Sequence, residues 1–81
     1  MDSANIVLKA FAFRWLTYCR ANGINIHLTL RIARERFGIK TSYNVLYNAS
    51  KGIQYRPITL YTLCGLCEVL NKPLSYFISE E

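Results

Sequence analysis

The chain has 81 residues with ten Lys and Arg against five Asp and Glu, a formal charge of +5. We therefore expect one domain, residues 1–81, without room for a second, ligand-sensing domain. The excess of positive charge lies in the middle of the chain. Seven cations and one anion from Arg20 to Arg56 give that segment +6, while the two flanks together carry −1. Such a segment suits a polyanion, either nucleic acid or an anionic membrane surface, but charge alone favours the simpler interpretation of a solvated face.

The first predicted helix runs from about Asn5 to Ala21, and Asn22-Gly23 ends it. Apolar residues at spacings of three and four predict its buried stripe: Leu8, Phe11, Ala12, Trp15 and Cys19. Other apolar residues lie outside that stripe: Ile6, Val7, Phe13, Leu16 and Tyr18. So small a core cannot cover them all, and leftover apolar surface usually indicates an interface.

The same run does not fit a membrane span or a signal peptide. Lys9 and Arg14 interrupt it, and it is shorter than the ~20 residues that a span needs. Its start carries Asp2, where a signal peptide has cations. We therefore expect a soluble, cytoplasmic protein without a membrane partner.

The second predicted helix begins near Thr29, an acceptable N-cap, and stops at Gly38. Asn25 is an alternative start, because the stretch INIHL is ambiguous. The buried residues of this helix are predicted to be Leu30, Ala33 and Phe37.

The third predicted helix starts after a cap at Thr41 or Ser42 and continues to Lys51, with Gly52 as its stop. A loop, IQYRPI, follows it. If this helix buries Val45, Leu46 and Ala49, its opposite face carries, at about 100° per residue, Tyr43, Asn44, Tyr47 and Lys51, with Asn48 at the edge.

The fourth predicted helix follows a cap at Thr59, and the fifth is opened by Pro73. Gly65 costs the fourth helix about 1 kcal/mol relative to alanine, so tertiary packing must hold it. The predicted buried face of the fourth helix is Leu60, Leu63, Cys64, Cys67 and Leu70. The apolar residues of the fifth are Leu74, Phe77 and Ile78.

Three cysteines are an odd number and do not form a closed disulfide framework, which favours a reducing compartment. Cys64 and Cys67 have CxxC spacing, and with Cys19 and His27 they could supply three sulfurs and one nitrogen to zinc. We favour a core role for the cysteines instead, since both members of the CxxC pair fall on the predicted apolar stripe. No metal or other cofactor is expected.

The face of the third helix is unlike a merely solvated one, which normally uses Glu, Lys and Gln. Asparagine can bond to the adenine edge in the major groove, and tyrosine offers a hydroxyl to phosphate or a ring to a thymine methyl. The second and third predicted helices are short and joined by a tight turn, and the third presents such a face. This arrangement is typical of a helix-turn-helix, in which the second helix of the motif enters the groove. The neighbouring arginines would then neutralise phosphates.

Several residues add a resemblance: Ala33, Phe37-Gly38-Ile39, Leu46, Gly52, Pro57 and above all TLYTLCGLCEVLNKPLSYFI, residues 59–78. Over about residues 14–78 the chain resembles the Xre, or lambda-repressor-like and Cro-like, helix-turn-helix family. The resemblance implies an all-α, compact five-helix fold, dimeric binding to operator DNA and transcriptional regulation, often by phage, plasmid or toxin-antitoxin modules. Family members often place a DNA-contacting glutamine at the start of the second helix, where this chain has Leu30.

We therefore predict a sequence-specific regulator, a repressor that binds double-stranded DNA as a homodimer. The residues expected to read bases are Ser42, Tyr43, Asn44, Tyr47 and Asn48. Those expected to bind phosphate are Arg31, Arg34, Arg36, Lys40, Thr41, Lys51, Tyr55 and Arg56. The alternative is a module of the same fold that binds a protein partner, such as an antitoxin gripping its toxin.

An enzyme is disfavoured. The chain has one histidine, no paired carboxylates in a plausible pocket and no glycine-rich phosphate loop. His27 is expected to be a loop residue rather than a general base.

Overall fold

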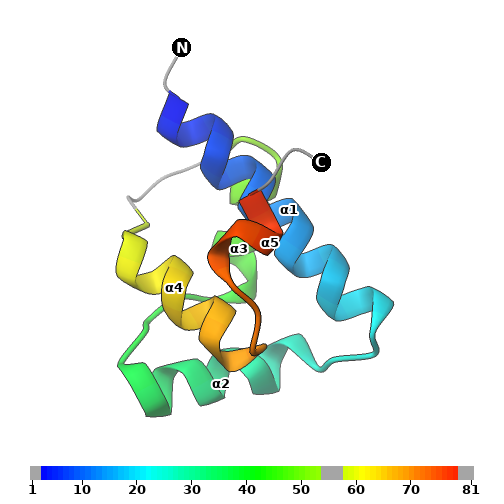
Figure 1. The fold of residues 1–81 in the computed structure, drawn as a ribbon, viewed down its shortest axis with the longest axis vertical. Coiled ribbons are helices and arrows are strands. Elements are labelled where there is room, and N and C mark those ends of the chain that lie inside the picture. The colour runs from blue at the N-terminus through cyan, green and yellow to red at the C-terminus, as the bar shows by residue number, and fades with distance from the viewer. Residues whose placement is uncertain (1–2, 54–57, 79–81) are drawn as a thin grey trace.

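In the computed structural model of this protein, the described residues are 3–53 and 58–78, with side chains from Val7 onward. These residues form five helices and no strand: α1 (Ser3–Ala21), α2 (Ile26–Phe37), α3 (Tyr43–Ser50), α4 (Leu60–Val69) and α5 (Leu74–Ile78). The all-α expectation is confirmed. α1 packs against α3 and α5, and α2 packs against α4 (Figure 1).

The start of α2 differs from the predicted one. Asn25 is the N-cap, and its side-chain oxygen accepts a hydrogen bond from the amide of Leu28 at 3.0 Å. Thr29 is buried inside the helix, where its hydroxyl donates to the carbonyl of Asn25 at 2.8 Å. The alternative start was therefore correct, because asparagine satisfies an open amide of the first turn at least as well as threonine does.

The caps predicted at Ser42 and Thr59 and the stop predicted at Gly38 are confirmed, whereas α1 begins at Ser3 rather than near Asn5 and α3 ends at Ser50 rather than at Lys51. Ser42 caps α3 by accepting from the amide of Val45, and Thr59 caps α4 by accepting from the amide of Thr62. Gly38 ends α2 with φ 70°, in the left-handed region where glycine carries no steric penalty. The α2–α3 turn thus spans residues 38–42.

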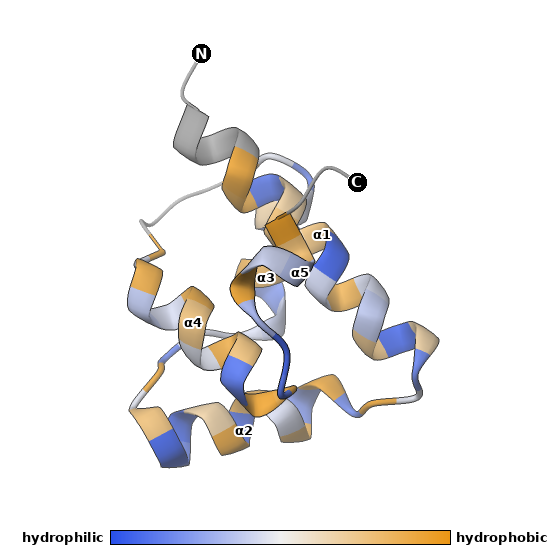
Figure 2. Cartoon of the chain, in the orientation of Figure 1, coloured by the Kyte–Doolittle hydropathy of each residue, from blue (hydrophilic) through white to orange (hydrophobic). Residues whose placement is uncertain are grey.

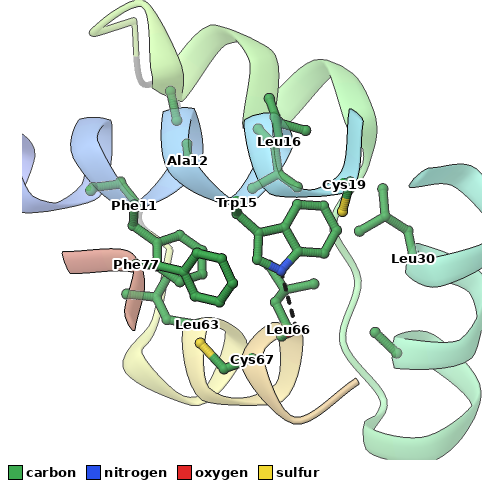
Figure 3. Close-up of a cluster of buried hydrophobic side chains, with 14 of the residues drawn as sticks. Phe11, Ala12, Trp15, Leu16, Cys19, Leu30, Leu63, Leu66, Cys67 and Phe77 are labelled. Atoms are coloured by element: carbon green, nitrogen blue, oxygen red, sulfur yellow. Dashed lines mark hydrogen bonds between the residues drawn. The ribbon is translucent and has the colours of Figure 1, made fainter. Parts of the chain in front are cut away.

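The predicted stripe of α1 forms the centre of the core (Figure 3), where all five of its residues are buried. Leu16, predicted to lie outside the stripe, is buried as well, because α3 and α5 pack on two sides of α1. Val7 and Phe13 remain exposed. The side chain of Ile6 lies outside the described residues.

The buried face of α4 is rotated from the predicted one. Leu60 is 65% exposed and Cys64 is exposed, so the core role predicted for these two is wrong. Leu66 is buried in their place, and Leu63 and Cys67 are buried as predicted. Because hydrophobic residues recur along the whole length of α4 (Figure 2), its own pattern did not decide which face meets the core.

Two contacts tie α4 to the end of α2 and to the turn that follows. The hydroxyl of Tyr61 donates to the carbonyl of Phe37 at 2.7 Å. Gly65 is buried, and a Cβ atom placed on it would overlap the side chain of Ile39, itself buried in the turn. The glycine in α4 therefore allows the turn between α2 and α3 to approach the helix closely.

The indole of Trp15 joins α1 to the last turn of α4. Its Nε1 donates to the carbonyl of Leu66 at 3.1 Å, and both side chains are fully buried (Figure 3). In a continuing α-helix the amide of Leu70 would donate to the carbonyl of Leu66. Here it donates instead to the carbonyl of Cys67 at 3.1 Å. The indole therefore satisfies a carbonyl at a helix end that the helix itself leaves open.

Replacing Trp15 by phenylalanine is expected to lower the free energy of unfolding by about 2–3 kcal/mol. The variant leaves a buried carbonyl without its donor, which costs about 1–3 kcal/mol, and also leaves a cavity. Urea unfolding of the two proteins measures the difference. Phe11→Leu is a suitable comparison, since it removes buried volume without removing a hydrogen bond. Equal losses for the two variants would contradict a role for the indole N–H.

Within the part of the chain that the structure describes, no helix combines the length and the apolar composition that crossing a bilayer requires.

Candidate nucleic-acid interface

A cleft of about 390 Å³ lies where α2 faces the start of α3. From α2 it is lined by His27, Leu30, Arg31 and Arg34, and from the α3 side by Thr41, Ser42, Tyr43 and Asn44. His27, Arg31 and Arg34 share one face of α2 because their spacings are four and three residues. Residues 42–44 are the cap and the first residues of α3, so the cleft that Arg31 and Arg34 line also includes the positive end of that helix's dipole.

An aromatic ladder extends from this cleft along α3. The Tyr43 ring stacks on that of Tyr47, with 5.8 Å between centroids and 23° between planes. The His27 ring centroid lies 5.8 Å from that of Tyr43, and the ammonium group of Lys51 lies 5.0 Å from the Tyr47 centroid. The ladder holds the tyrosine side chains in defined positions on the outer face of α3.

Tyr43 is also fixed from α1. Arg20 donates from Nη2 to the hydroxyl of Tyr43 at 2.9 Å. The ring is half-buried, and its hydroxyl can still donate one hydrogen bond. Tyr43 therefore presents a phenol hydroxyl whose position is fixed by the guanidinium group of Arg20.

Three of the five predicted base-reading residues meet in the cleft: Ser42, Tyr43 and Asn44. Asn44 is exposed there, and Tyr47 continues the same face, 39% exposed. Ser42 accepts from the amide of Val45, so its side-chain oxygen is engaged in the cap. Asn48 is half-buried and does not line the cleft, which makes it the least available of the set.

The predicted phosphate-binding residues are distributed unequally. Arg31 and Arg34 line the cleft and are exposed. Arg36 lies about 200° around the helix axis from Arg34, with its guanidinium 5.0 Å from the Phe37 ring centroid. Thr41 lines the cleft, but its hydroxyl oxygen is covered and has no hydrogen-bond partner among the described residues, a geometry that does not offer it to phosphate.

The remaining predicted residues flank the cleft or lie beyond the described residues. Lys40 is exposed in the turn, and Lys51 is exposed at the end of α3. Tyr55 and Arg56 lie outside the described residues, as does Pro57.

Two residues of this surface were missed or misjudged from sequence. His27 was expected in a loop, but it lies in the first turn of α2, lines the cleft and contacts Tyr43. Arg20 was counted only in the basic segment, although it positions Tyr43. Choosing Asn25 as the N-cap would have placed His27 in the first turn of the helix, on the same face as Arg31 and Arg34. Leu30 lines the cleft but is only 7% exposed and packs in the core.

The cysteines divide into two environments. Burial raises the pKa of Cys67 to about 11, with a smaller contribution from Cys64 nearby, and burial likewise raises the pKa of Cys19 to about 11 although Arg20 acts in the opposite direction. Cys64 is exposed. Among the described residues, no group of three or more His, Cys, Asp and Glu side chains is arranged to hold a metal ion.

These environments are expected to separate the thiols by reactivity. A thiol with a pKa near 11 is about one part in a thousand thiolate at pH 8, and the thiolate is the reactive form. Ellman's reagent at pH 8 is therefore expected to modify one thiol per native chain rapidly, and all three in denaturant. Cys64→Ser should abolish the fast phase. Two fast thiols in the native protein would contradict the burial of Cys19 or Cys67.

Among known proteins, no family model, no curated protein and no solved structure matches this chain. The functional inference therefore depends on the cleft and on the surface around it.

Proposed function

We propose that the protein is a sequence-specific DNA-binding transcriptional regulator with a lambda-repressor-like helix-turn-helix, in which α3 enters the major groove. The observation that carries the proposal is the cleft, where Arg31 and Arg34 face the capped start of α3 and exposed Asn44. Phosphate contacts there would set the register, and the side chains of α3 would read base edges. The described residues that line the cleft do not suggest an enzyme active site, because they include no nucleophile paired with a general base.

Asn44 is the residue best placed to read a base. It is exposed in the first turn of α3, and a carboxamide can accept from and donate to adenine at the same time. Tyr43 and Tyr47 are proposed to contact a thymine methyl or a phosphate from the ladder. In a repressor homodimer two such helices would lie about 34 Å apart, one turn of DNA.

Selection of bound duplexes from a random library tests the proposal. We expect a palindromic consensus, since a two-fold dimer reads two equal half-sites. Asn44→Ala is then expected to cost about 1–3 kcal/mol on the consensus and to relax the preference at one position of each half-site, with little change on random duplex. Equal losses on both duplexes would remove Asn44 as a reader, and a library without enrichment would contradict sequence-specific binding.

A module that binds a protein is the second candidate, favoured by the apolar side chains that α1 leaves exposed. Phe13 is 59% exposed and Val7 43% exposed. Sedimentation with and without duplex DNA separates the two functions. A monomer that ignores DNA up to high concentration would favour the interaction module.

A further inference from the structure

A groove of about 600 Å³ lies between α1 and α5 and shares no lining residue with the α2–α3 cleft. Aromatic side chains dominate its walls: Phe13 is 59% exposed, Tyr76 is 51% exposed and Tyr18 is half-buried. Aromatic residues clustered at the surface are typical of protein interfaces, where they contribute much of the binding energy.

Two of the aromatic side chains in the groove, Tyr18 and Tyr76, are held to the core through Phe77. The Tyr18 ring packs edge-on against Tyr76, with 5.6 Å between centroids, and against Phe77 at 5.8 Å. Phe77 is fully buried and contacts Phe11 in the same way at 5.7 Å. Tyr18 and Tyr76, which are held in this manner, lose little conformational entropy when a ligand binds, because their rotamers are already set.

The groove is positively charged as well as aromatic. The ammonium group of Lys72 lies 4.9 Å from the Tyr76 centroid and 5.9 Å from the Tyr18 centroid, and Arg14 lines the groove from α1. Its described lining residues include no carboxylate. A complementary ligand therefore combines apolar groups with negative charge.

Two other occupants fit this charge less well. A second copy related by a two-fold axis through the groove would place Arg14 and Lys72 against the same cations of its partner. A single nucleic-acid strand needs open aromatic faces and a track of cations along its backbone. Here Lys72 already lies over two of the rings, and the described lining residues include two cations, Arg14 and Lys72, which form no track.

We infer that this groove binds an acidic segment of a partner protein. An apolar side chain of that segment inserts between Phe13 and Tyr76, and flanking carboxylates pair with Arg14 and Lys72. The two surfaces share no lining residue, so a partner bound in the groove does not occupy the cleft. The inference does not depend on DNA binding, because no residue of the α2–α3 cleft enters it.

Selection from a displayed library of random dodecapeptides against the immobilised full-length protein tests the inference. We expect the enriched peptides to combine several Asp or Glu with at least one large apolar residue. Binding of a labelled enriched peptide, followed by fluorescence anisotropy, should weaken at least tenfold in Lys72→Glu and in Phe13→Ser. Lys9→Glu, which makes the same charge change at an exposed position of α1 outside the groove, should change the affinity less than twofold. Circular dichroism confirms that each variant is folded.

Four outcomes would overturn the inference. The first is a selection without enrichment or without an acidic excess, and the second is an equal loss in Lys72→Glu and Lys9→Glu. The third is displacement of the peptide by a single-stranded dodecathymidylate, which would assign the groove to nucleic acid. The fourth is a dimer in sedimentation that Phe13→Ser dissociates, which would assign it to a second copy.

Discussion

Replacing Gly65 by alanine is expected to lower the free energy of unfolding by about 1–2 kcal/mol, although alanine is the better helix former by about 1 kcal/mol. The added Cβ would overlap Cδ1 of Ile39 and lie 3.4 Å from its Cγ1. Ile39 is 3% exposed, so it has little room to move away, and overpacking of a core costs about 1–3 kcal/mol. Urea unfolding at 25 °C measures the change.

The double variant with Ile39→Val tests the cause of that loss. Valine lacks the Cδ1 atom, which in isoleucine occupies the place that the new Cβ at position 65 would take. Ile39→Val alone is expected to cost about 0.5–1.5 kcal/mol. In its background Gly65→Ala should become neutral or stabilising, a coupling of about 2 kcal/mol between the two sites. Additive losses would show that the close approach of the turn is not what requires glycine.

Replacing Arg31 and Arg34 together by serine is expected to weaken binding to the selected duplex more than 100-fold at 0.1 M salt. Hydrogen bonds to charged groups contribute about 1.5–3 kcal/mol each, and about 2.7 kcal/mol corresponds to a factor of 100. The slope of log K against log salt should fall by about 1.8, because each lost phosphate contact removes about 0.9. The loss should be equal on specific and random duplexes, since phosphate contacts carry no sequence information.

Two single variants show whether the cleft is the phosphate site. Arg36→Ser removes the same charge from the same helix, but its guanidinium lies against Phe37 on another face, and a smaller loss is expected. Lys9→Ser removes one charge from α1 and should leave the salt slope unchanged. If Arg36→Ser weakened binding as much as Arg34→Ser, the cleft would not be the place where the phosphate is held.

Within the site, local patterns predicted part of the surface. The Ser42 cap and the outer face of α3 follow from cap chemistry and helical periodicity, which involve residues within a few positions of each other. The sequence did not separate Arg31 and Arg34 from Arg36, because charge alone does not tell which side of α2 faces α3. The contact of Arg20 with Tyr43 spans 23 residues, so no local pattern contains it.

By itself the sequence determined five helices, most of their ends and the buried stripe of α1, because caps, stops and amphipathic spacing act within a turn or two. The tertiary structure decided which face of the largely apolar α4 is buried, and it placed Gly65 against Ile39. It also decided that His27 joins Arg31 and Arg34 in one cleft. These outcomes depend on how distant helices pack together, and the free energy of that packing is not contained in any one segment.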